Sequence, residues 1–330
     1  MQKQEENKPE KSCCLVRDKI EQAFNHDADT IKAVLDKEHD GVIKIDDIIL
    51  IKCELEKNFE NCFTVCLIKD AKPITVGYLY WGSYNPMRQD VYFRFDNQRL
   101  YDTKELPLQH IASTLKLQRL NLPCVDLAMD FNFNVIDKIY ELEADLDIDV
   151  IILNKQRNKT EYIPEQTNTS KGTLCNPNKY RGFDIQARDK NHKLMISAYD
   201  KTLEIKTASH KHYITKAEGF DQIYRLEVRA SRSQLHTSLK TLDITYEEFI
   251  TSLINKDDDV LIKVWKHLFS RILRFRKRGK RESEDIIDIL FTDEICRKTK
   301  RKPIIANIKA LIHKARNIAE LCFYSLKDIA

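Results

Sequence analysis

Two carboxylates stand four positions apart in the stretch Val125–Phe131, at Asp126 and Asp130. Apolar residues alternate with them, which predicts a β-strand that buries one face and opens the other to solvent. On such a strand both carboxylates point the same way and lie roughly 13 Å apart. They are too distant to share one small ion, so a metal site here needs a ligand from a neighbouring strand. The simpler interpretation is an amphipathic strand with a solvated face.

The elements expected to position these residues make an α+β chain with an antiparallel sheet and flanking helices. Apolar residues recur at helical spacing from Leu15 to about Leu35, which predicts a first helix. Runs rich in Ile, Val, Tyr and Phe then predict strands at 42–54, 62–69, 75–81, 90–95, 125–131, 150–153, 183–188, 194–201 and 223–230. Further helices are expected at 106–120, 135–146, 246–254, 260–275, 283–291 and 303–324.

This order of elements predicts four regions. They are a disordered tail at 1–14, a β-rich region with flanking helices at 15–120, a sheet domain at 121–235 and a basic helical region at 236–330. Whether 42–100 forms a separate domain or extends the sheet stays open.

Composition narrows the class of protein. The nine cysteines among 330 residues are scattered and include no Cys-x-x-Cys pair, which argues against a zinc ribbon and a disulfide framework. The polar N-terminus has no apolar run long enough for a signal peptide or a membrane span. We therefore expect a cytoplasmic protein in a reducing compartment, without a membrane partner.

Positive charge is concentrated in the last quarter of the chain. Residues 257–330 hold 18 Lys/Arg and 11 Asp/Glu, a surplus of 7, and since the net charge is +4, the first 256 residues carry about −3. A basic region of this kind favours a polyanionic partner.

Three short stretches now align in order: Val-Asp-Leu-Ala-Met-Asp-Phe at 125–131, Ala-Tyr-Asp-Lys-Thr-Leu-Glu at 198–204 and Tyr-Arg-Leu-Glu-Val-Arg at 224–229. Their order and spacing resemble the rolling-circle replication initiators of plasmids and some filamentous phages, the trans-acting replication initiation factor family. That family has an Asp-hydrophobic-Ala-x-Asp strand, a Tyr-(Asp/Asn)-Lys-x-x-Glu segment and an Arg-(Leu/Val)-Glu strand. The resemblance covers roughly residues 120–235.

The resemblance implies an endonuclease that nicks one DNA strand at an origin, leaving a 5′-phosphotyrosyl link and a 3′-OH that primes replication. Such chemistry uses a nucleophile, a divalent cation and carboxylates that hold it, and Mg²⁺ or Mn²⁺ prefers oxygen ligands. The implied metal ligands are Asp126, Asp130 and Glu227, although Glu227 fits equally well as a strand-surface partner of Arg225 or Arg229.

Lys201 is expected to hold a phosphate, or else to be a solvated strand end. Glu204 fits the start of a helix, where the dipole favours a carboxylate.

The nucleophile is where this chain departs from the family. Plasmid members carry Tyr-Phe-Gly-x-Arg-Asp ahead of the Tyr-Asp-Lys segment, whereas Asp184 occupies the tyrosine's place here. The nearest substitute is Tyr180, between Lys179 and Arg181, whose charges would stabilise a phenolate. We take Tyr180 as the expected nucleophile. The alternatives are Tyr199, Tyr213, Tyr224 or no nucleophile at all.

Other catalytic patterns are weak or missing. The one His-x-His motif, His210-Lys211-His212, has a lysine between the histidines and is interpreted as a solvated loop rather than a metal site. The sequence has no Gly-rich phosphate loop, which argues against an NTPase.

Two dense basic runs favour DNA. Residues 271–281 hold seven Lys/Arg and no acid, and 297–302 hold five in six positions, a pattern that supplies phosphate contacts without sequence information. Residues 293–322 resemble a helix-turn-helix reader weakly. The predicted DNA-binding residues are Arg271, Arg274, Arg276, Lys277, Arg278, Lys280, Arg281, Arg297, Lys298, Lys300, Arg301 and Lys302.

The sequence thus predicts a metal-dependent nicking initiator with DNA, as origin duplex and single strand, as its partner. The resemblance adds a homodimer and a host helicase as expected partners. A non-catalytic DNA-binding initiator or regulator on the same scaffold is the alternative, because the Tyr-Phe-Gly segment is replaced. A single-strand-binding or packaging protein is a third.

Overall fold

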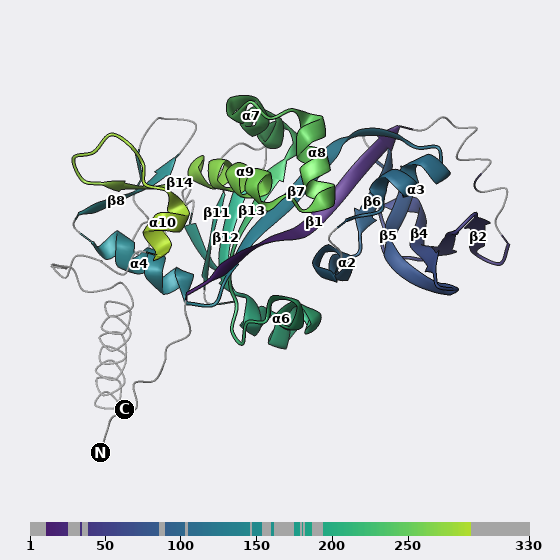
Figure 1. Cartoon of the computed structure of the whole chain (residues 1–330), viewed down its shortest axis with the longest axis horizontal. Coiled ribbons are helices and arrows are strands. Elements are labelled where there is room, and N and C mark those ends of the chain that lie inside the picture. Colours follow the sequence, from purple (N-terminus) through teal and green to yellow (C-terminus); the bar gives the residue numbers. More distant parts are fainter. Residues whose placement is uncertain are drawn as a thin grey trace, which may run out of the picture.

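A computed structural model of the chain describes residues 11–25, 34, 39–85, 90–102, 105–145, 147–153, 160–161, 175–178, 180, 182–186 and 194–291. Over these residues the fold is α+β, as predicted. One large antiparallel sheet carries helices on both faces (Figure 1).

The strands of the N-terminal half are β1 (Cys13–Asn25), β2 (Val42–Ile45), β3 (Ile48–Lys52), β4 (Phe59–Lys69), β5 (Lys72–Ser83) and β6 (Val91–Phe95). Those that follow are β7 (Gln118–Phe131), β8 (Ile148–Leu153), β9 (Thr160–Glu161), β10 (Cys175–Asn178), β11 (Gly182–Gln186), β12 (Leu194–Asp200), β13 (Tyr224–Ser231) and β14 (Leu273–Lys277).

The helices are α2 (Asn97–Asp102), α3 (Leu108–Thr114), α4 (Val135–Ala144), α5 (Lys201–Glu204), the π-helix η1 (Ile205–Ser209), α6 (Tyr213–Glu218), α7 (Arg232–Leu242), α8 (Tyr246–Asn255), α9 (Asp258–Ser270) and α10 (Ile286–Phe291). No helix in the described ranges has the length and apolar character needed to cross a membrane.

Among the described strands, eleven form one sheet in the order β10-β11-β12-β13-β7-β1-β6-β5-β4-β3-β2, and β14-β8-β9 form a second. The long strands β1 and β7 run across the centre and join the two ends of the molecule (Figure 1). Strands β2 to β6 therefore belong to the same sheet as β7, β12 and β13.

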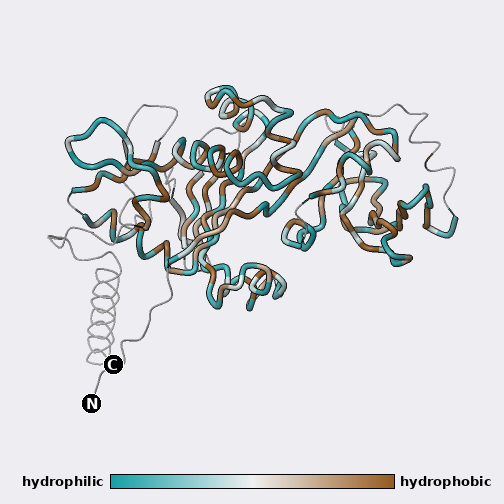
Figure 2. Tube along the Cα trace, viewed as in Figure 1, coloured by the Kyte–Doolittle hydropathy of each residue, from teal (hydrophilic) through white to brown (hydrophobic). Residues whose placement is uncertain are grey.

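The apolar core lies under α7, α8 and α9. Leu127 of β7 and Val228 of β13 face these helices, whose Leu235, Val264 and Trp265 are fully buried. Figure 2 shows the hydrophobic segments along the central strands and the hydrophilic ones at loops and outer helix turns. The opposite face of the same strands carries the charged residues, and α2 and α6 lie on that side (Figure 1).

The helix predicted from Leu15 is wrong, because β1 occupies this stretch up to Asn25. β1 pairs with β7 on one side and β6 on the other, and three register shifts interrupt its alternation. A strand that is buried on both faces and bulged loses the period of two, so its apolar residues imitate helical spacing.

Other helix and strand boundaries differ from the predicted ones, mostly at residues where the chain changes direction. The run 42–54 is a β2–β3 hairpin, with Asp46 at φ 51° in the turn. The helix predicted at 106–120 ends at Thr114, and Lys116 at φ 54° leads into β7. The helix predicted at 260–275 ends at Ser270, and β14 follows.

Candidate functional site

β7 and β13 lie side by side, as a shared site requires. Arg225 stands opposite Asp130 and Arg229 opposite Asp126, with Glu227 between them opposite Ala128. The alternation predicted for both strands is confirmed, because the three charged residues of β13 share one face with the two aspartates. The predicted solvated face is wrong, since Asp126, Asp130 and Glu227 are all buried.

Arg225 is the centre of this face and is fully buried. Its Nε donates to Asp130 Oδ1 at 2.6 Å and its Nη2 donates to Asp130 Oδ2 at 2.5 Å, so the ion pair is bidentate. Its Nη1 reaches Asp18 Oδ1 at 2.5 Å, and Nη2 also donates to the Tyr101 hydroxyl at 2.6 Å. A buried guanidinium needs such partners, because an unpaired charge in this environment is strongly destabilising.

Arg229 holds the second aspartate. Its Nη2 donates to Asp126 Oδ2 at 2.7 Å and approaches Glu227 Oε1 at 3.3 Å. The Arg229 side chain is 44% exposed, so the guanidinium connects the buried carboxylates with solvent. The sequence alternative made Glu227 a strand-surface partner of Arg225 or Arg229; the pairing with Arg229 is confirmed, and the surface position is wrong because Glu227 is buried.

Glu227 is a buried carboxyl whose charged form is disfavoured. Burial, followed by the nearby charges of Asp18 and Asp126, raises the pKa of Glu227 to about 7, although Arg225 and Arg229 act against the shift. The hydroxyl of Tyr199 donates to Glu227 Oε2 at 2.9 Å. A carboxyl pKa raised into this range is the property expected of a general base or acid.

Asp18 belongs to the same face and was missed from the sequence. It lies at the β1 bulge between Arg17 and Lys19, where the register with β7 shifts. Burial alone would raise the pKa of Asp18, but Arg225, Lys201 and Lys211 hold it below its usual range. No sequence pattern indicates Asp18 as a site residue. The spacing of apolar residues in this stretch predicts a helix, and the bulge forms only when β1 pairs with β7.

Tyr180 lies next to this face. Its ring centroid is 6.1 Å from that of Tyr199, and its carbonyl accepts from the backbone N–H of Asp200 at 3.0 Å. Tyr199 is itself buried, and burial together with Glu227 raises its pKa well above the usual value, which disfavours the phenolate. Tyr213 donates to Asn97 Oδ1, and Tyr224 accepts from Gln222 Nε2.

Lys201 is buried rather than a solvated strand end. Its Nζ pairs with Glu204 at 2.9 Å and lies 5.7 Å from the centroid of the Tyr199 ring. Asp200 caps α5 by accepting from the N–H of Leu203, so the turn that presents Lys201 is fixed locally. His210 and His212 are exposed, as expected for a solvated segment.

A further acid, the half-buried Glu218, comes from α6. Burial, followed by the charge of Asp130, raises the pKa of Glu218 to about 10, so this carboxyl is neutral at physiological pH. A neutral acid beside Asp130 adds no further negative charge to the group formed by Arg225, Asp130 and Asp18.

The three predicted metal ligands do not form a ligand set in this arrangement. Asp126 and Asp130 direct their oxygens at arginines, and the part of the chain that the structure describes holds no group of three His, Cys, Asp or Glu suited to a metal. A guanidinium occupies the position beside each aspartate where a cation would otherwise bind. The residues present therefore do not fit Mg²⁺ or Mn²⁺ without rearrangement of the arginines.

Most basic residues of the run 271–281 form hydrogen bonds or ion pairs with other residues of the chain. Arg271 donates to Gln234 O and Ser238 Oγ, and Arg274 donates to Ser270 O. Arg276 and Arg278 reach Asp149, and Lys277 reaches Glu284.

Lys280 and Arg281 are exposed and make no ion pair with described residues. They are the members of this run best placed for DNA. The predicted residues Arg297, Lys298, Lys300, Arg301 and Lys302 lie outside the described residues, as do the predicted last helix and the helix-turn-helix segment.

No protein-family model and no curated protein matches the chain. Among solved structures, the chain is similar to a rolling circle replication initiator protein from Geobacillus stearothermophilus. The identity is 11% and the TM-score 0.38, over 82% of this chain and 90% of that chain. A likeness at this level carries no argument, so the functional assignment rests on the residues themselves.

Proposed function

We propose that this protein is a replication initiator of the rolling-circle type, which binds an origin and nicks one DNA strand through a tyrosine. One observation carries the proposal: the three segments that resemble the family lie on adjacent strands, and Tyr180 stands against Tyr199, which is hydrogen-bonded to Glu227. A candidate nucleophile, a proton acceptor and cationic groups thus border one face.

In this proposal the Tyr180 oxygen attacks the phosphodiester and loses its proton. Glu227 is the acceptor, because its pKa of about 7 leaves it partly ionised at neutral pH. Arg229, which reaches solvent, and Lys201 stabilise charge on the phosphate oxygens. As the bond from Tyr180 to phosphorus forms, the bond from phosphorus to the 3′ oxygen breaks, and that oxygen takes up a proton from solvent. The products are a 5′-phosphotyrosyl link and a free 3′-OH.

The finer parts of the assignment are proposals too. They are a plasmid or phage origin as the DNA, a homodimer, recruitment of a host helicase and a cytoplasmic location. A Mg²⁺ or Mn²⁺ requirement belongs to the proposal only if Arg225 and Arg229 move away from the aspartates. Lys280 and Arg281 would contribute salt-sensitive contacts to the duplex.

A second candidate is a DNA-binding initiator without catalysis. The pairing of Asp126 with Arg229 and of Asp130 with Arg225 favours it, since these arginines occupy the sites where a catalytic cation would be held. In that case the ion pairs serve to fix the sheet, and DNA binding is the whole activity.

A nicking assay separates the two. Purified protein is mixed with supercoiled DNA carrying its own gene and flanks, with and without Mn²⁺, and any DNA-linked peptide is mapped by mass. We expect a nick with the adduct on Tyr180, abolished in Tyr180→Phe and retained in Tyr84→Phe, which alters an exposed tyrosine of the other half. Specific binding without a nick, both with and without Mn²⁺, would establish the non-catalytic initiator instead.

A further inference from the structure

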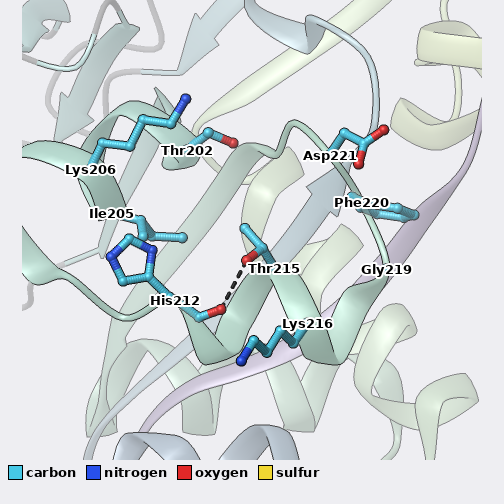
Figure 3. Close-up of a pocket in the computed structure, with 9 residues that line it drawn as sticks. All are labelled: Thr202, Ile205, Lys206, His212, Thr215, Lys216, Gly219, Phe220 and Asp221. Atoms are coloured by element: carbon cyan, nitrogen blue, oxygen red, sulfur yellow. Dashed lines mark hydrogen bonds between the residues drawn. The ribbon is translucent and has the colours of Figure 1, made fainter.

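A pocket of about 450 Å³ opens beside the candidate site (Figure 3). Its walls are α5, η1, the start of α6 and the turn before β13, so it begins directly after Lys201 in the chain. This volume lies within the range of protein pockets that hold one small molecule or one nucleotide. We call it the α6 pocket.

A small buried core and two hydrogen bonds of backbone N–H groups hold the walls of the α6 pocket in place. Ile205, Ile214 and Ile223 form a small buried core behind it. The Thr202 hydroxyl accepts from the Ile223 N–H at 2.7 Å, and the wide π-turn closes with a bond from the His210 N–H to the Ile205 carbonyl at 2.9 Å. π-Turns are uncommon and occur often at functional sites. The pocket is therefore preformed.

Its lining combines positive charge with an aromatic ring. Lys206 of η1 and Lys216 of α6 lie at opposite ends of it, and His212 lies between them along one edge of the view (Figure 3). Both lysines are exposed, and neither forms an ion pair or hydrogen bond with the described part of the chain. Phe220 and Asp221 lie together on the other side (Figure 3). The two lysines suit the two phosphates that flank a nucleotide, and Phe220 suits its base.

We propose that the α6 pocket binds one nucleotide of a single DNA strand. The phosphates on either side of this nucleotide lie against Lys206 and Lys216, one at each end, the base stacks on Phe220, and Asp221 accepts a hydrogen bond from a base N–H. Cationic grooves with aromatic platforms are the usual means of holding single strands. The inference rests on the proposed function and deepens it, because the pocket adjoins Lys201 and gives the strand at the candidate site a path across α6.

The test measures binding of a fluorescent twelve-residue oligodeoxythymidine to the full chain by anisotropy at several salt concentrations. Each phosphate contact to a single strand contributes about 0.7 to the slope of log K against log salt. We expect Lys206→Gln/Lys216→Gln to lower that slope by about 1.4. The control Lys69→Gln/Lys72→Gln removes two exposed lysines from the β4–β5 hairpin and should leave the slope unchanged.

A third variant tests whether the base stacks on Phe220. Phe220→Leu keeps an apolar side chain against the Ile205 core but removes the stacking surface, so affinity should fall about tenfold while the slope stays the same. An equal loss of slope in the lysine variant and its control would overturn the proposal. Binding of free thymidine monophosphate as tightly as the oligonucleotide would also overturn it, because the pocket would then serve a free nucleotide.

The assay requires neither nicking nor metal, so the two proposals fail separately. A chain that never nicks DNA but shows the expected change in slope keeps the α6 pocket as a strand site. A chain that nicks at Tyr180 without any change in slope keeps the proposed function and loses the pocket.

Discussion

The charged face of the central sheet changes character on the two sides of β1. Toward β13 it buries ions, with Arg225 held between Asp130 and Asp18. Toward β4 and β5 the same face buries rings, with Phe59 centred 4.7 Å from Tyr80 and 5.7 Å from Tyr92. The register of β1 places both sets on one face, since Glu21 pairs with Cys124 on one side and with Arg94 on the other.

The two halves gain stability differently. Burying aromatic rings removes apolar surface from water and is favourable without further conditions. Burying an ion pair costs desolvation that the attraction offsets only when the geometry is good, and an apolar replacement is often no worse. A face that retains such pairs next to Tyr180 and the α6 pocket therefore suggests a role beyond stability, whereas the aromatic half needs no other explanation.

The largest effect should come from removing the central cation. Arg225→Met leaves Asp130 and Asp18 buried without their partner, and we expect it to lower the free energy of unfolding by about 3–5 kcal/mol. Denaturant titration measures the change. Adding Asp130→Leu should recover part of the loss, because the uncompensated charge is then removed. A double variant as unstable as the sum of its single changes would contradict the ion-pair account.

A medium effect should come from Glu227 and should depend on pH. The folded pKa of about 7 exceeds the unfolded value of about 4.3, so the folded chain binds the extra proton between these values and its stability falls as pH rises through this window. Glu227→Gln resembles the protonated form and removes this dependence. We expect it to be more stable than the wild type at pH 8, on the order of 2 kcal/mol, and nearly equal at pH 4.

Thermal or denaturant unfolding at several pH values measures this difference. A Glu227→Gln curve parallel to that of the wild type would show that Glu227 is not the group with the raised pKa.

The smallest effect should come from the aromatic half. Phe59→Leu removes one ring from the cluster with Tyr80 and Tyr92, which should cost about 1 kcal/mol at every pH and leave DNA binding unchanged. Tyr84→Leu, at a side chain that is 72% exposed, is the control and should change stability by less than about 0.5 kcal/mol. A pH-dependent loss in Phe59→Leu would remove the contrast between the halves.

The sequence by itself determined the α+β class and the positions of most strands. It also determined which residues of β7, and which of β13, share one face of their strand. Alternation alone places Asp126 and Asp130 on one face of their strand and Arg225, Glu227 and Arg229 on one face of theirs. These predictions succeed because the side-chain period of a strand is local and needs no knowledge of its neighbours.

Only the tertiary structure decided which charges meet and how deeply they lie. The register of β7 against β13 gives each aspartate an arginine, and the bulge of β1 adds Asp18, which no spacing indicates. Burial in the folded chain then raises the pKa of Glu227 on β13 and of Glu218 on α6. Register, bulges and burial depend on residues that are distant in sequence, so the pattern of one strand cannot specify them.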